Sequence, residues 1–247
     1  MEARFLGVIM DDKLTWGSHI TAVRMKMARY IGVMYKIKGQ LPMKVRIQLY
    51  HSFVQSYLNF CSLVWGFASK THIESLFRRQ KQGIRAIMPG YVNYRYKDGQ
   101  LPSHTKSSFY NNCILTVQGL IVKNALILMH KAKHFPLSLP YSVINMFPDN
   151  MPSLGSDCDT SAAWLAVYGN MNFRSSIFYK GPLLAINDIN VDITTLPSLF
   201  SINLYKKSAN RKMLEMQNLG NDEEWPNFLL YSIPGLRRSP RTRSDQN

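Results

Sequence analysis

An amphipathic helix with one basic side is predicted by residues 71–88, THIESLFRRQKQGIRAIM. Apolar residues recur in this stretch every three or four positions, the spacing that brings side chains to one face of an α-helix. This stripe consists of Ile73, Leu76, Phe77, Ile84 and Ile87, together with Gln80. Thr71 and Glu74 match a capping box, in which each side chain accepts a hydrogen bond from a free backbone N–H. The other sides of the helix carry the cations Arg78, Arg79, Lys81 and Arg85.

Two more helices are expected upstream of this one, over residues 19–38 and 42–58. The apolar stripe of the first consists of Ile20, Val23, Met27, Tyr30, Ile31 and Met34. Three cations lie off that stripe, namely Arg24, Lys26 and Arg29. The second helix carries a stripe of Val45, Leu49, Phe53 and Val54, and Pro42 stands in its first turn, where proline is tolerated. The three segments together predict a helical bundle with basic outer faces.

The residues before the bundle favour β-structure. Phe5–Met10 is a short apolar run that we expect to form a strand, with a turn at Asp11–Lys13. Leu14–Trp16 then either returns as a second strand or leads into the first helix. The expected fold is therefore mainly α with a short β-hairpin at the N-terminus.

The pattern is less regular after residue 90. Residues 91–106 are rich in Tyr, Gly and Pro and predict a linker. A fourth helix is expected from about Phe109 or Leu115 to Lys133, and a last one over Ser198–Gln217. Four prolines between them predict a long loop over 135–160, and the Arg-rich tail 234–247 is expected to be disordered.

The positive charge of the chain indicates a polyanionic partner. The 247 residues include 30 Lys and Arg against 15 Asp and Glu, a net charge of +15. Residues 1–90 hold 14 of these cations against 4 acids, so most of the excess lies on the predicted bundle. Nucleic acid is the commonest polyanion for such a surface. A 46% hydrophobic and 12% aromatic composition argues against general disorder.

The sequence predicts an intracellular protein, nuclear or cytoplasmic, that is neither secreted nor inserted in a membrane. The N-terminus lacks the apolar core and cleavage site of a signal peptide. The longest apolar stretch, Gly119–Met129, is interrupted by Lys123 and Asn124 and is too short to span a bilayer. Three scattered cysteines give no disulfide framework.

No catalytic or metal site is predicted. Asp11 and Asp12 follow an apolar run, as paired aspartates do in polymerases, but two-metal chemistry needs carboxylates converging from separate strands. We therefore interpret the pair as an acidic turn. His130 and His134 have a spacing that can bind zinc, yet no third ligand accompanies them. We expect no cofactor.

Two groups of residues in the first 90 positions resemble non-LTR retrotransposon reverse transcriptases. The first group, similar to the segment just after the polymerase palm, is Phe5-Leu6-Gly7-Val8, Asp11, Leu14-Thr15-Trp16 and His19-Ile20. The second group, similar to the thumb, is Tyr57-Leu58-Asn59, Cys61, Val64-Trp65-Gly66, Leu76, Gln80, Lys81, Arg85 and Ile87. A weaker likeness to the region after the thumb continues in Ala125-Leu126, Phe135-Pro136, Arg174-Ser175-Ser176 and Lys180-Gly181-Pro182.

The resemblance implies a role for each segment. Phe5, Leu6, Gly7 and Val8 would form a primer-grip-like edge of the palm, and the three helices would form the thumb. The chain would then divide into a hairpin remnant (1–18), a thumb-like bundle (19–90), the linker (91–106), a loosely packed helical and irregular region (107–233) and the tail (234–247). The family's catalytic aspartates and their Mg²⁺ belong to a palm that would precede Met1, so the resemblance implies a truncated protein without that chemistry.

Three functions remain open from the sequence. The first is a non-catalytic fragment that binds an RNA/DNA template–primer hybrid, with phosphate contacts from Arg24, Lys26, Arg29, Arg78, Arg79, Lys81 and Arg85. The second is an RNA-directed DNA polymerase of a mobile element. The third is a structural or interaction remnant whose basic faces only keep it in solution. The oligomeric state is left open.

Overall fold

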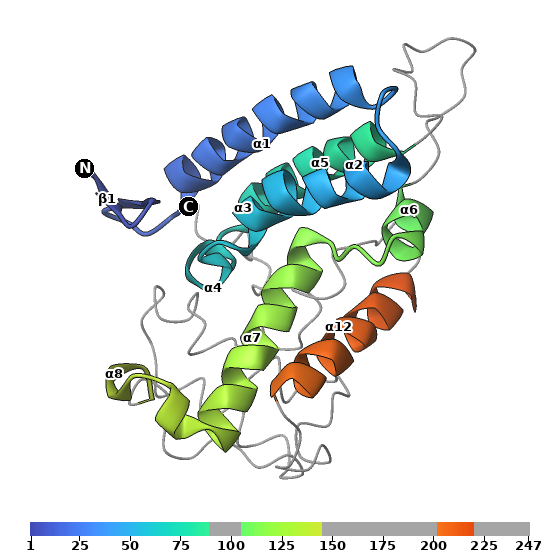
Figure 1. Ribbon diagram of the computed structural model, residues 1–247. Helices are drawn as coiled ribbons and strands as arrows, with labels where there is room; N and C mark the ends of the chain where they lie inside the picture. Colours follow the sequence, from blue (N-terminus) through green and yellow to red (C-terminus); the bar gives the residue numbers. More distant parts are fainter. Residues whose placement is uncertain (89–104, 145–201, 220–247) are drawn as a thin grey trace, which may run out of the picture.

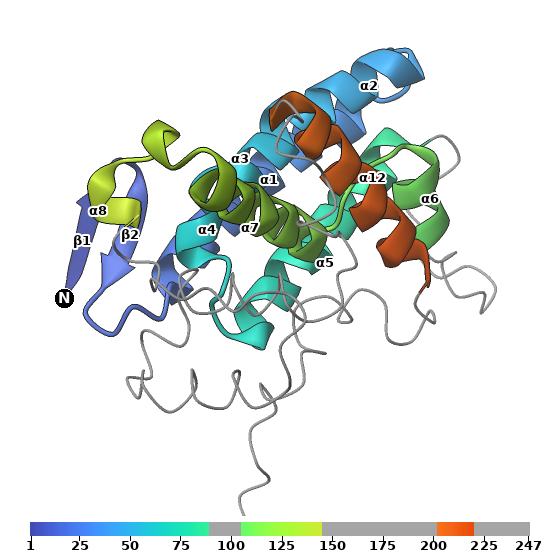
Figure 2. The same cartoon turned by 90° about the horizontal axis from the view of Figure 1, so that it is seen from below.

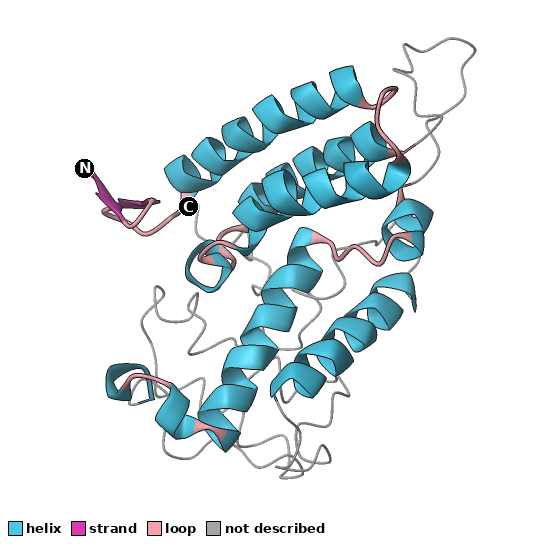
Figure 3. Ribbon diagram, viewed as in Figure 1, coloured by secondary structure: helices cyan, strands magenta, loops and turns pink. Residues whose placement is uncertain are grey.

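The computed structural model describes residues 1–88, 105–144 and 202–219, and these residues are mainly helical with one short hairpin (Figures 1 and 3), as predicted. The elements are β1 (Glu2–Phe5), β2 (Val8–Asp11), α1 (Gly17–Ile37), α2 (Met43–Tyr50), the π-helix η1 (His51–Gln55), α3 (Ser56–Asn59), α4 (Ser62–Trp65), α5 (Lys70–Ile87), α6 (Lys106–Asn111), α7 (Val117–His134), the 3-10 helix η2 (Pro136–Ser138), α8 (Tyr141–Ile144) and α12 (Ile202–Leu219). The predicted linker, the loop after residue 144 and the basic tail lie wholly or largely outside the described residues. In the part that is described, no helix is both long and apolar enough to cross a membrane.

The N-terminal hairpin turns earlier than the sequence predicted. β1 and β2 pair antiparallel, with Phe5 opposite Val8, so Leu6 and Gly7 form the turn. Both turn residues have positive φ, 47° and 84°, as a two-residue hairpin turn of the favoured hand requires. The prediction of one strand over Phe5–Met10 was therefore wrong, because the chain reverses in the middle of that apolar run.

The predicted three-helix bundle is confirmed in its main elements. Figure 1 shows α1 and α5 running side by side in the same direction. The segment α2–η1–α3, which follows α1 in the sequence, runs in the opposite direction. An ideal Cβ at Gly17 would lie 3.2 Å from the His72 ring, and one at Gly83 would lie 3.6 Å from Ile31, so the two helices touch along their length. Their common core is apolar and closed to solvent, as Met27, Leu76 and Ile84 show.

The second helix buries only part of the predicted stripe. Val54 is fully buried as predicted, together with Tyr50 and Leu58, whereas Val45 and Leu49 are partly buried and Phe53 is 38% exposed. The cause of this exposure is η1, in which the Ser56 N–H binds the His51 carbonyl five residues back instead of four. This wider turn shifts the register, so a stripe counted at regular helical spacing through Phe53 was wrong.

The capping box predicted at Thr71 is also absent. α5 begins at Lys70 with Ser69 as its N-cap, and no side chain caps it. Glu74 instead forms an ion pair with Lys70, with 3.7 Å between Nζ and Oε1, and Thr71 is exposed. The helix therefore starts before the Thr–Glu pair and includes it.

A second pair of helices, α7 and α12, packs below the bundle (Figures 1 and 2). Of the two starts predicted for the fourth helix, Leu115 is confirmed by α7 to within two residues, whereas Phe109 lies in the separate helix α6, because Cys113 turns the chain with φ 53°. α12 runs antiparallel to α7, since its residue Gln217 binds Thr116 at the start of α7 and Tyr205 binds Leu126 further along. The last helix predicted over Ser198–Gln217 is confirmed to within a few residues.

Gly66 sets the distance between the bundle and α7. An ideal Cβ at Gly66 would lie 2.2 Å from the Ser62 carbonyl oxygen and under 3 Å from two carbons of Ile121. Only glycine fits such a contact. The short helix α4 therefore sits directly on α7, and Asn124 adds a hydrogen bond of 2.9 Å to the Ser62 hydroxyl.

Candidate nucleic-acid interface

The basic surface of the bundle is built on the parallel pair α1 and α5. α1 contains no carboxylate, and α5 contains one, Glu74, which pairs with Lys70 at the start of the helix. The remaining cations of both helices therefore meet no opposite charge within their own helices. Such a surface attracts a polyanion.

Four of the seven predicted phosphate contacts lie at the joint between α1 and α5 or on the outward side of α5. At about 100° per residue, Arg78 and Arg85 lie on the side of α5 opposite the buried Gln80. Arg79 lies on the flank shared with His72 and Gly83, which is the flank that touches α1. Arg24 of α1 lies on the flank shared with Ile31, which touches α5. We call the surface formed by Arg24, Arg78, Arg79 and Arg85 the seam surface.

Local contacts hold the seam surface in shape. Arg79 Nη1 donates to Gln82 Oε1 at 2.6 Å, and the Tyr35 hydroxyl of α1 donates to the Gln82 carbonyl at 3.3 Å. Burial raises the pKa of Tyr35, and the nearby Arg85 acts in the opposite direction. The Nε of Arg85 is itself buried and has no hydrogen-bond partner among the described residues.

The other three predicted contacts lie away from the joint between the two helices. Lys81 lies one turn before Arg85, on the flank of α5 that faces away from α1, with its Nζ 4.4 Å from the centre of the Phe77 ring. Burial, and then Arg85, lower the pKa of Lys81. Lys26 lies on the opposite flank of α1 from Arg24, and Arg29 faces outward. The seven cations that the sequence suggested as one group of phosphate contacts therefore lie on different sides of the two helices.

An aromatic stack beside Lys26 was missed by the sequence reasoning. The Tyr30 ring stacks on Phe53 with centroids 4.7 Å apart and on Tyr57 at 5.8 Å. Lys26 Nζ lies 5.6 Å from the Tyr57 centroid. A hydrogen bond with Tyr30, and then burial, raise the pKa of Tyr57. The sequence placed Tyr30 on the buried stripe of the first helix, but all three rings are partly exposed.

Asp11 holds the chain between the hairpin and α1. Its carboxylate accepts hydrogen bonds from the backbone N–H groups of Lys13, Thr15 and Trp16 and from the Thr15 hydroxyl, at 2.9–3.0 Å. The bond from the Thr15 backbone is the largest cause of the lowered pKa of Asp11. Leu14 and Trp16 are thereby held at positive φ, 50° and 64°. Asp11 thus has a structural role in this acidic turn.

The primer-grip-like residues surround the hairpin turn. Phe5 and Leu6 are 64% and 78% exposed, whereas Val8 is buried. Gly7 lies against the Phe60 ring, to which an ideal Cβ would be 3.6 Å away. The structure therefore presents two apolar side chains to solvent at this end of the molecule, and their role in holding a primer stays a prediction.

The first of the two histidines with zinc spacing packs against an aromatic ring. His130 is buried and stacks on the Tyr205 ring with centroids 3.8 Å apart. The side chain of His134 lies outside the described residues. Within the described ranges, no three His, Cys, Asp or Glu side chains come close enough together to hold a metal ion.

Comparison with known proteins relates the chain to mobile elements. No protein-family model and no solved structure matches it. It is 24% identical over 88 residues to a probable RNA-directed DNA polymerase from transposon X-element of Drosophila melanogaster. The aligned stretch covers 34% of this chain and 10% of that protein. It is 30% identical over 98 residues to the RNA-directed DNA polymerase from mobile element jockey of the same organism, covering 37% and 11%.

This distant, partial similarity supports an origin related to reverse transcriptases. The chain spans about a tenth of the length of these curated relatives.

Proposed function

We propose that this chain is a thumb-like part of a retrotransposon reverse transcriptase that binds an RNA/DNA template–primer hybrid through the seam surface. The observation that carries the proposal is the parallel packing of α1 on α5. It places Arg24 and Arg79 along the joint between the two helices and Arg78 and Arg85 beside it. The similarity to two RNA-directed DNA polymerases supports the choice of nucleic acid as the polyanion.

The arrangement suits the sugar–phosphate backbone of a duplex. Arginine binds phosphate through two parallel N–H donors, so each guanidinium both neutralises and orients one phosphate. Arg78 and Arg85 are seven residues apart, about 10 Å along the axis of α5, and can contact different phosphates. None of these contacts reads a base edge, so we expect binding to depend little on sequence.

Under this proposal, the described residues neither join nucleotides nor bind Mg²⁺. Two-metal phosphoryl transfer needs carboxylates that converge on the ions, and Asp11 uses its carboxylate oxygens to hold the turn before α1. Primer extension with Mg²⁺ or Mn²⁺ tests the second function left open by the sequence. Incorporation of dNTPs onto a primed RNA by the purified chain would overturn this part of the proposal.

Charge reversal of the seam surface tests the proposal directly. We expect the variant Arg78→Glu, Arg79→Glu, Arg85→Glu to lose at least tenfold in affinity for a fluorescent RNA/DNA hybrid, measured by anisotropy. The matched control is Lys13→Glu, Lys36→Glu, Lys44→Glu, which changes the net charge equally at exposed positions outside the surface. Melting temperatures establish that both variants fold, and Arg78→Gln with Arg79→Gln provides a milder pair.

Two outcomes contradict the proposal. An equal loss of affinity in the control variant would mean that net charge alone attracts the hybrid. No loss in either variant would favour the third function, a remnant whose charges only keep it in solution. If each of the four arginines neutralises one phosphate, the logarithm of the affinity should fall with that of the salt concentration at about −0.9 per phosphate for a B-form duplex. A flat salt response would also refute binding through phosphates.

A further inference from the structure

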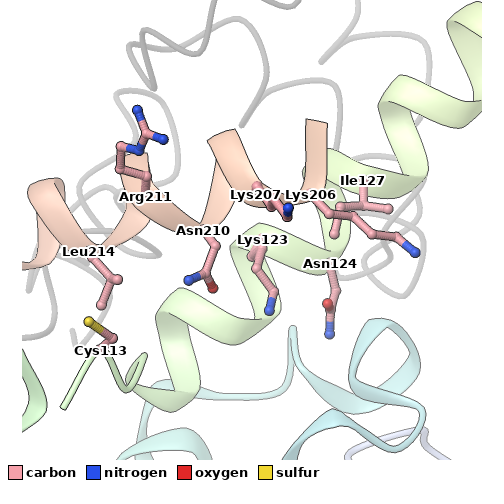
Figure 4. Close-up of a pocket in the computed structure, with 9 residues that line it drawn as sticks. All are labelled: Cys113, Lys123, Asn124, Ile127, Lys206, Lys207, Asn210, Arg211 and Leu214. Carbon is pink, nitrogen blue, oxygen red and sulfur yellow. The ribbon is translucent and has the colours of Figure 1, made fainter. Parts of the chain in front are cut away.

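A cationic groove lies between α7 and α12, apart from the seam surface (Figure 4). Its volume is about 570 Å³, and it is lined by Cys113, Lys123, Asn124, Ile127, Lys206, Lys207, Asn210, Arg211 and Leu214. Figure 4 shows Lys123 and Asn210 in its central part, Cys113 and Leu214 at one end, and Arg211 extending away from α7 at the rim. Figure 1 places these two helices below the bundle, away from α1.

The sequence builds this groove from two helix faces. Lys206, Lys207 and Asn210 share one side of α12, and Lys123 and Ile127 are four residues apart on α7. Hydrogen bonds near the two ends, from Thr116 N–H to Gln217 and from the Tyr205 hydroxyl to the Leu126 carbonyl, hold the helices together. The facing cations therefore belong to a fixed pair of elements, although about 80 residues separate them in sequence.

Among the described residues, the cations of the groove meet no opposite charge. No described carboxylate lines the groove, and none of its four cations forms an ion pair with a described residue. Lys123 is largely buried, and this burial, followed by the repulsion of Lys206, lowers the pKa of its ammonium. Repulsion between these like charges in a partly desolvated groove costs free energy, and a bound anion would offset this cost.

We propose that this groove binds the phosphates of a single nucleic-acid strand, with Lys123, Lys206 and Lys207 as the contacts. A groove between two helices fits one strand rather than the broad side of a duplex. Ile127 and Leu214 offer apolar contact to a base or sugar, and the Asn210 amide can donate to a phosphate oxygen. The inference rests on the proposed function for its ligand class but uses none of the same residues.

Protection of lysines locates the strand on the full chain. The chain is treated with an amine-acetylating reagent with and without a 20-nucleotide poly-uridine RNA, and modification is read by mass spectrometry. We expect Lys123, Lys206 and Lys207 to be protected at least threefold, with Lys44 as the exposed reference. Protection of the reference lysine to the same extent would refute a defined groove site.

Substitution measures the contribution of the groove. The variant Lys123→Gln, Lys206→Gln, Lys207→Gln should bind the poly-uridine RNA at least tenfold more weakly and lose about 2 from its salt slope, at about 0.7 per phosphate for a single strand. Lys13→Gln, Lys36→Gln, Lys44→Gln is the control of equal charge. Since Lys123 is largely buried, Lys206→Gln with Lys207→Gln is a second variant confined to exposed positions.

The outcomes separate this inference from the proposed function. If the groove variants bind RNA normally while the seam variant loses the hybrid, the inference fails and the proposed function stands. If only the groove variants lose RNA, the inference stands and the proposed function fails. Competition with inorganic tripolyphosphate distinguishes the source of the phosphates. Complete displacement at equal phosphate concentration would show a site for small anions and overturn the assignment to a strand.

Discussion

Gln80 and Gln217 belong to two different helices, α5 and α12, yet both bind the backbone of the same four residues, Ile114–Val117. The Gln80 amide donates to the Leu115 carbonyl at 2.9 Å and accepts from the Val117 N–H at 2.8 Å. Gln217 accepts from the Thr116 N–H at 2.9 Å and donates to the Ile114 carbonyl at 3.3 Å. The start of α7 is therefore held by the bundle and by α12 together.

Replacing Gln80 should destabilise the whole described part of the chain. Gln80→Leu leaves the buried Leu115 carbonyl, Val117 N–H and Tyr50 hydroxyl without this partner. Each such loss costs about 1–3 kcal/mol, and we expect a total of about 3 kcal/mol by urea denaturation. The exposed Gln48→Leu is the matched control, with an expected change within about 0.5 kcal/mol. A similar, small effect of both substitutions would mean that the Gln80 contacts contribute little.

Two glycines should respond in opposite directions to the same substitution. Gly66→Ala drives a Cβ into the Ser62 carbonyl and Ile121, and we expect a loss of at least about 2 kcal/mol. Gly32→Ala, in α1 with nothing within 4 Å of its Cβ, should instead stabilise the protein by about 0.5–1 kcal/mol. Thermal unfolding of both variants measures the difference. A stable Gly66→Ala protein would refute the close contact between α4 and α7.

The turn before α1 should weaken in acid. Hydrogen bonds to the Asp11 carboxylate lower its pKa below 3.8, so they stabilise the fold above the pKa of the unfolded chain and are lost as the pH falls through the lower folded value. Asp11→Ala should therefore cost about 1 kcal/mol at pH 7 and much less at pH 2. Asp12→Ala, at an exposed neighbour, should cost almost nothing at either pH. A cost of Asp11→Ala that does not change with pH would contradict the role of its charge.

Lys123 in the groove should lose its positive charge at a lower pH than an exposed lysine does. Burial lowers the pKa of Lys123, so its ammonium deprotonates at a lower pH than usual and its attraction for phosphate disappears there. The ratio of poly-uridine affinities between the unmodified chain and Lys123→Gln should therefore be largest near pH 7 and shrink towards pH 9.5. The same ratio for Lys44→Gln serves as the control. A Lys123→Gln effect that grows with pH would contradict this assignment.

Local periodicity predicted the bundle well. The predicted helices 19–38 and 71–88 differ from α1 and α5 by one or two residues at each end, because an unbroken apolar stripe specifies both the helix and its buried face. Gln80 was placed on the buried stripe, but its partners lie 30 to 37 residues away and no local pattern reveals them.

The errors have separate physical causes. Leu6 was an unexpected turn residue, because leucine rarely adopts positive φ, although Gly7 beside it was an available signal. The stripe of the second helix was wrong at Val45 and Leu49 because apolar residues lie on several sides of α2, so their spacing does not identify the buried side, and wrong at Phe53 because this residue lies in the π-helical turn. The groove was missed because its two walls come from residues 123–127 and 206–214, which only the tertiary fold brings together.

The π-helical turn at His51–Gln55 holds one residue more than a regular α-helical turn would over nearly the same rotation. Deleting a single residue inside it would let the segment wind as an ordinary α-helix and leave Leu58, which follows it, facing the interior. The same deletion in the middle of α1 would rotate every later side chain by about 100° and turn the buried Met34 away from the core. This stretch is therefore where the bundle should best accept the loss of a codon, and related sequences should differ in length here before they do so in α1 or α5.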